Sequence, residues 1–161
     1  MFEPDENGVV AVVQASSIRR IFAFGVLGAL GGLILYTTLT FPPAPIWMVV
    51  MLVFGGAVIY LTDKMRRATL DVITLTTTDV RCSSGVILAR LDEIESVDRG
   101  AFAFKPSNGF ILRLNTKKPR GWAPGLWWQF GNRIGVGGVT SAGQSKFMAE
   151  QIALRLVQVE D

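Results

Sequence analysis

Two long runs of apolar residues without a charge dominate the first part of the chain. Residues 21–41 read IFAFGVLGALGGLILYTTLTF, and residues 46–62 read IWMVVMLVFGGAVIYLT. A helix that crosses a bilayer needs about 20 apolar residues, so the first run is long enough and the second is at the short limit. The PPAP segment between them cannot continue a helix and predicts a tight turn. The pattern therefore predicts a two-helix transmembrane hairpin over residues 21–62.

Two other interpretations of these runs compete with the hairpin. A cleaved signal peptide fits poorly, because about 20 mostly polar residues precede the first run and a second apolar run follows at once. A helical hairpin buried in a soluble core is also disfavoured, since a small domain could not easily cover two uncharged helices of this length.

Positive charges flank the predicted hairpin at its two outer ends. Arg19 and Arg20 precede the first run, and Lys64, Arg66 and Arg67 follow the second, whereas the turn carries no charge. Under the positive-inside rule this distribution predicts that both termini are cytoplasmic.

Glycine is frequent in the first run. Gly28 and Gly32 form a G-x-x-x-G pair, Gly25 lies on nearly the same helical face, and Gly31 points away from that face. Small residues let helix backbones approach closely in lipid. The glycines could simply serve the packing of the two helices on each other. The sharper hypothesis is that the face of Gly25, Gly28 and Gly32 receives a helix of another membrane protein.

The chain changes character after the second run, and residues 63–161 are expected to form a cytoplasmic domain. Short segments that favour strands alternate there with turn signals such as the Asn-Gly pair at 108–109, the strongest hairpin dipeptide. The expected strand segments are residues 70–82, 85–91, 94–97, 110–115, 126–130 and 133–139. We therefore expect a small sandwich or barrel of about six or seven strands.

The two ends of the chain frame this domain differently. Ser141 and Gln144 form a capping-box pattern before a helical run in which apolar residues recur once per turn. These apolar residues are Met148, Ile152, Leu156 and Val159. Residues 1–20 are assigned to a cytoplasmic N-terminal segment. Within it, residues 8–15 could add a strand or form a helix on the membrane, and periodicity does not decide between them.

Composition limits the chemistry that the chain can perform. Its 161 residues carry a net charge of only +3, so it is not a basic protein of the nucleic-acid-binding type. The absence of histidine removes the commonest general base and metal ligand, and a single cysteine, Cys82, excludes an intrachain disulfide. The acidic residues Asp92, Glu93, Glu95 and Asp98 are interpreted as a solvated edge. Residues 131–138 match neither the dinucleotide fingerprint nor the P-loop. We expect no catalysis, cofactor, metal, nucleic acid or small-molecule substrate.

A basic, tryptophan-rich segment is the most distinctive feature of the second half. Residues 117–128, KKPRGWAPGLWW, hold three cations and three of the four tryptophans. Adjacent tryptophans in a strand point to opposite sides, so one can be in the core while the other needs a cover. That cover could be the domain itself, the lipid interface or a partner. The residues expected to face membrane or partner are Lys117, Lys118, Arg120, Trp122, Trp127, Trp128 and Arg133.

The order of strands followed by one helix resembles the pleckstrin-homology (PH) architecture. Residues 73–97, ITLTTTDVRCSSGVILARLDEIESV, resemble the start of bacterial PH-like domains, which have an LT…R strand, a Gly turn and an I-x-x-V segment. The matching positions are Leu75, Thr76, Arg81, Gly85, Ile94 and Val97. The resemblance covers roughly residues 70–158 and implies a PH-like barrel capped by the C-terminal helix.

The resemblance implies a scaffold and transfers no ligand site. Some membrane-anchored members act as assembly or stability factors for membrane complexes, so the expected role is that of a non-catalytic accessory subunit or assembly factor. Its expected partners are an integral membrane protein complex and membrane lipids in the bacterial inner membrane. The alternative is a module that binds anionic lipids through residues 117–128.

Overall fold

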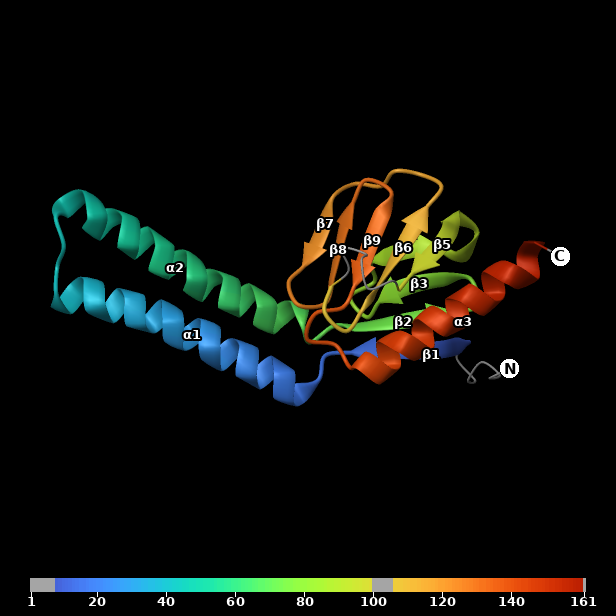
Figure 1. The fold of residues 1–161 in the computed structure, drawn as a ribbon, viewed down its shortest axis with the longest axis horizontal. Helices are drawn as coiled ribbons and strands as arrows, with labels where there is room; N and C mark the ends of the chain where they lie inside the picture. Colours follow the sequence, from blue (N-terminus) through green and yellow to red (C-terminus); the bar gives the residue numbers. More distant parts are fainter. Residues whose placement is uncertain (1–7, 100–105, 161) are drawn as a thin grey trace.

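A long helical hairpin projects from a small β-rich domain (Figure 1). The computed structural model describes residues 8–99 and 106–160. The helices are α1 (Ser17–Thr40), α2 (Pro45–Ala68), the short 3-10 helix η1 (Leu91–Glu93) and α3 (Ala142–Glu160). The strands are β1 (Val9–Gln14), β2 (Val72–Thr76), β3 (Asp79–Cys82), β4 (Ile87–Arg90), β5 (Ile94–Asp98), β6 (Phe110–Leu114), β7 (Gly121–Ala123), β8 (Trp127–Phe130) and β9 (Arg133–Val136). The predicted general architecture of apolar hairpin, β domain and C-terminal helix is confirmed.

The two hairpin helices pack on each other through one glycine each. A Cβ on Gly31 would lie 2.8 Å from Cδ1 of Ile59, and a Cβ on Gly55 would lie 2.7 Å from Cδ2 of Leu35. A larger residue at either position would push the facing side chain away. These two glycines therefore set the close approach of α1 and α2.

Most of the hairpin surface is apolar and uncovered. Phe22, Leu33 and Phe54 are 72%, 59% and 56% exposed. Only 11% of the most apolar 18-residue window of each helix is buried inside the structure. Both helices are long and apolar enough to cross a membrane. The interpretation as a core hairpin of a soluble protein does not fit, because the β domain covers almost none of either helix.

The strand β1 precedes the hairpin in the chain and yet belongs to the first sheet, whose order is β1-β2-β3-β4. It runs antiparallel to β2, with Val13 opposite Ile73 and Gln14 opposite Val72. Val13 and Ile73 are fully buried. The hairpin is thus inserted between two paired strands. The β domain therefore includes residues 9–14, which were expected to belong to a separate N-terminal segment 1–20. Residues 1–7 of that segment lie outside the described part.

The second sheet has the order β5-β6-β9-β8-β7, so β7 forms one of its edges. The described residues contain nine strands, more than expected, because β1 joins from before the hairpin and β7 forms inside the basic segment 117–128. The core between the two sheets contains fully buried Leu75, Leu88, Phe110, Leu112, Leu126 and Ile134.

Helix α3 closes the domain on the side of β1 and β5 (Figure 1). Met148 and Ile152 are fully buried, as the helical periodicity predicted, and the side chain of Val159 lies outside the described part. Gln144 takes a different role from the one expected of a capping box. Its Oε1 accepts a hydrogen bond of 3.1 Å from the backbone N–H of Gln14. The start of α3 is therefore tied to the end of β1.

Hydrogen bonds from two arginines fix the base of the hairpin to the domain. Arg19 Nη1 donates to the carbonyl oxygen of Thr140 at 2.9 Å. Arg20 Nη1 donates to the carbonyl oxygen of Thr69, the C-cap residue of α2, at 3.4 Å. Both arginines were noted in the sequence as charges that set the membrane orientation. In the structure they also connect the start of α1 to the chain before α3 and to the end of α2.

Candidate functional site

The glycine face of α1, formed by Gly25, Gly28 and Gly32, is uncovered. A Cβ built on any of these three glycines would meet no atom of the remaining structure within 4 Å. Gly31, in contrast, is buried against α2. Because successive helical residues are about 100° apart, Gly32 looks well away from the α1–α2 contact. The hairpin therefore packs without using the face that the sequence suggested for a partner helix.

The three tryptophans of the basic segment have three different environments. Trp127 points into the core and is 9% exposed. Its indole lies against Gly121, where a Cβ would be only 2.8 Å from the ring. Trp128 is half-buried on the other face and lies across Gly135, where any side chain would collide with the indole. Trp122 remains 52% exposed. Adjacent tryptophans thus face opposite sides, as predicted. The expectation that Trp127 faces the membrane or a partner is wrong, because its side chain fills the core.

Trp122 lies beside the end of the second hairpin helix. It stands directly opposite Trp128 in the β7–β8 pair, so both rings lie on the outer face of the sheet. The Nζ atom of Lys64, on α2, lies 4.9 Å from the centroid of the Trp122 ring. A cation over an indole face is an attractive arrangement, especially when partly shielded from water. The contact links the basic segment to the helix end.

The turn between β7 and β8 reinforces this link. Gly125 has a φ of +79°, which favours glycine, and a Cβ there would lie 2.8 Å from Cε of Met65 and 3.3 Å from Cγ2 of Thr69. Figure 1 shows β7 at the side of the domain that faces the hairpin. The β7 edge is therefore held at the level where α2 ends.

Lys118 differs from the other cations of the segment because it is already paired. Its Nζ lies 2.6 Å from Oε2 of Glu93 and donates to the carbonyl oxygen of Leu88 at 3.3 Å. The Lys118 ammonium, with help from the backbone N–H of Arg90, holds the pKa of Glu93 below its ordinary value. Lys118 thus ties the segment to the first sheet, and it is not the free surface cation that the sequence suggested.

The remaining cations surround a shallow groove of about 560 Å³. Residues 117, 118 and 120 line one wall, so the paired Lys118 also belongs to the groove, and the β8–β9 turn with Arg133 lines the other. The guanidinium carbon of Arg120 lies 4.5 Å from the centroid of the Phe130 ring. Phe130 was missed in the sequence, although its position two residues after Trp128 in a strand places it on the same outer face.

The single cysteine of the chain lies in the core of the β domain. Cys82 is buried, and burial together with the charge of Asp71 raises the pKa of its thiol to about 12. At neutral pH it is therefore a protonated core residue. Among the residues described, no group of three or more acidic, cysteine or histidine side chains is placed to hold a metal ion.

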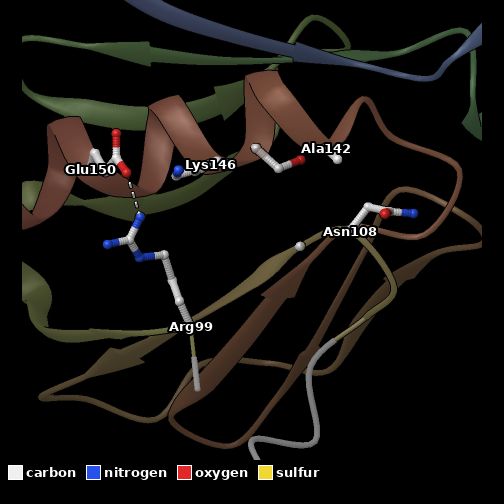
Figure 2. A pocket seen from close by; sticks show the side chains of 7 residues that line it. Arg99, Asn108, Ala142, Lys146 and Glu150 are labelled. Carbon is white, nitrogen blue, oxygen red and sulfur yellow. Dashed lines mark hydrogen bonds and ion pairs between the residues drawn. The ribbon is translucent and has the colours of Figure 1, made fainter. Parts of the chain in front are cut away.

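A second hollow, of about 760 Å³, lies between the start of α3 and the strands β5 and β6 (Figure 2). Arg99 spans it to reach Glu150, with an Nη1–Oε1 distance of 3.0 Å, while Lys146 and Asn108 stand at its rim. The ion pair of Arg99 and Glu150 therefore joins the end of β5 to α3 across this hollow.

Comparisons with protein-family models, with curated proteins and with solved structures found no match for this chain. The features of the chain that bear on its function are therefore the hairpin, the β7 edge and the groove.

Proposed function

We propose that this chain is a non-catalytic, membrane-anchored interaction protein that binds, stabilises or helps assemble a membrane protein complex. In this proposal α1 and α2 span the bacterial inner membrane, both termini are cytoplasmic, and the β domain is a PH-like scaffold. The order of strands and the single closing helix support the last point, together with the sequence resemblance over residues 70–158.

The dimensions and surface of the hairpin support the membrane placement. Each helix has 24 residues, about 36 Å at 1.5 Å per residue, which exceeds the roughly 30 Å hydrocarbon core of a bilayer. Their exposed apolar side chains form a surface far larger than soluble monomers leave in water. Lipid around this surface would remove it from water.

The connection of hairpin and domain supports the proposed orientation. Since β1 and β2 pair directly, the chain before α1 and the chain after α2 must lie on the same side of the membrane. The cations at that side are Arg19, Arg20, Lys64, Arg66 and Arg67. Their excess over the uncharged turn favours the cytoplasmic side.

The open glycine face of α1 is the observation that carries the proposed partner. A hairpin that needed glycine only for its own packing would require Gly31 and Gly55, which supply the close contacts with Ile59 and Leu35. Gly25, Gly28 and Gly32 form a second, unused face at which another helix could approach closely. In lipid, that close approach gives van der Waals contact without a hydrophobic driving force.

Copurification from native membranes in a mild detergent tests this proposal. The tagged full-length chain should bring down membrane subunits at fixed stoichiometry, and Gly28→Leu combined with Gly32→Leu should abolish that association. The bulky side chains would hold the partner backbone away, while their Cβ atoms would meet no other atom of the chain within 4 Å.

Two further variants make the result specific. Gly56→Leu adds the same bulk at another open glycine, on α2, and should leave the association intact. Gly31→Leu should instead disturb the hairpin, because its Cβ alone would already crowd Ile59. Unchanged copurification by the double variant, with normal insertion, would refute the glycine face as the partner surface.

A further inference from the structure

The groove between residues 117–120 and the β8–β9 turn gathers positive charge that the protein does not neutralise. In the described part of the chain, none of Lys117, Arg120 and Arg133 forms an ion pair, and the nearby Glu93 is already paired with Lys118. Arg113 also stands directly opposite Arg133 in the β6–β9 pair. Like charges facing each other across strands destabilise a sheet. The cluster therefore forms a positive surface that would attract an anion.

The groove is held in shape before any ligand arrives. The backbone N–H of Lys118 donates to the carbonyl oxygen of Gly131 at 3.0 Å, and that of Leu114 donates to the carbonyl oxygen of Asn132 at 2.8 Å. These bonds join the walls of the groove to each other. They also leave the side chains of Lys117 and Arg133 at its rim, both exposed to solvent.

Arg120 is oriented for a phosphate by the ring beneath it. Its guanidinium lies over Phe130, 4.5 Å from the ring centroid, and Phe130 is 58% exposed. The ring supports the guanidinium from one side, and among the described residues no carboxylate forms an ion pair with it. A planar fork of N–H donors matches two oxygens of a phosphate, which a lysine ammonium cannot do.

The position of the groove indicates where the phosphate comes from. Arg120 immediately precedes β7, and two residues later Trp122 contacts Lys64 at the end of α2. The β7 edge faces the hairpin, so a bilayer around α1 and α2 would bring its headgroup layer beside this strand (Figure 1). Exposed Trp122 suits the same interface, where amphipathic rings lie at headgroup level.

We propose that this groove binds the phosphate of an anionic phospholipid headgroup, with Arg120 as the fork and Lys117 and Arg133 as supporting charges. The inference rests on the proposed membrane placement of the hairpin, but not on the partner helix. Lys118 also lines the groove, but its charge is already paired with Glu93, so the proposal gives it a structural part only. The site also includes Phe130, which lies under Arg120.

Native mass spectrometry of the full-length chain in neutral detergent tests the site. The protein is titrated with phosphatidylglycerol, and in parallel with phosphatidylcholine, whose choline cation the groove should repel. Lys117→Gln, Arg120→Gln and Arg133→Gln together should weaken phosphatidylglycerol binding by about a hundredfold, since each cation near an anionic surface contributes about fivefold. Phe130→Leu keeps every charge and should lower affinity by a smaller factor, because Arg120 loses its platform.

Arg81→Gln with Arg90→Gln is the matched control, since both arginines are exposed on the other sheet and should leave phosphatidylglycerol binding unchanged. Equal binding by the triple variant and the unaltered chain would overturn the site. Displacement of the lipid by millimolar glycerol phosphate, with no preference between the two lipids, would overturn the lipid source in favour of a soluble phosphate. Copurification of membrane subunits with the triple variant is measured alongside, so loss of the lipid site alone does not count against the proposed partner.

Discussion

The placement of β1 in the core predicts that two adjacent valines respond very differently to the same substitution. Val13 is fully buried between the sheets, whereas Val12 points outward and is 37% exposed. Val13→Ala removes two buried carbon groups at about 0.8 kcal/mol each, and the cavity left behind raises the loss to about 2–3 kcal/mol of unfolding free energy. Val12→Ala should cost less than about 1 kcal/mol, and both changes share the same loss of strand propensity.

Thermal unfolding of the full-length chain in mild detergent measures this difference. Tryptophan fluorescence reports on the β domain, because Trp127 is part of its core. For a domain of about 100 residues, 1 kcal/mol shifts Tm by about 4–8 °C, so Val13→Ala should lower Tm by about 8 °C or more. Equal shifts for the two variants, or a larger shift for Val12→Ala, would refute the packing of β1 and with it the insertion of the hairpin into the domain.

Three other predictions follow from the chain outside the spans. The pKa of Glu93 is depressed below 4.5 in the folded chain, so its ionised carboxylate stabilises the fold above pH 4.5. This contribution is lost as the pH falls below 4.5 and through the folded pKa. Glu93→Gln should therefore flatten the decline of Tm between neutral pH and about pH 3. Cys82, whose thiol has a pKa of about 12, should resist iodoacetamide at pH 8 in the folded chain and react after denaturation, and equal labelling in both states would contradict its burial. A reporter fused after Asp161 should be active only in its cytoplasmic form, whereas periplasmic activity would reverse the proposed orientation.

The sequence could predict the features that repeat at a regular spacing. The uncharged runs located both long helices, and the once-per-turn apolar residues located the buried face of α3 at Met148 and Ile152. Alternation gave most of the strands of both sheets. Adjacent tryptophans at 127 and 128 were correctly expected on opposite sides of one strand.

What the sequence could not supply was the pairing of segments distant in the chain. The apolar pattern of residues 9–14 fits a strand and a helix equally well. Their partner strand, β2, follows only after the whole hairpin in the chain. The same limit applies to Lys118, since its carboxylate partner Glu93 comes from another part of the chain. Glycine spacing separated two faces of α1, but only the packed helices show that Gly31 is the one that meets α2.

The insertion of the hairpin between β1 and β2 also constrains the order of events during synthesis. β1 leaves the ribosome first, but its antiparallel partner is made only after both apolar helices have emerged. Until then the buried face of β1, with Val13, has no sheet to join. Closure of the first sheet must wait for the hairpin to reach its place, because the two strands meet only when the ends of α1 and α2 lie together. With the hairpin in the membrane as proposed, a chain whose hairpin fails to insert would expose an incomplete β domain along with its apolar helices. Both would mark it for removal by quality-control proteases.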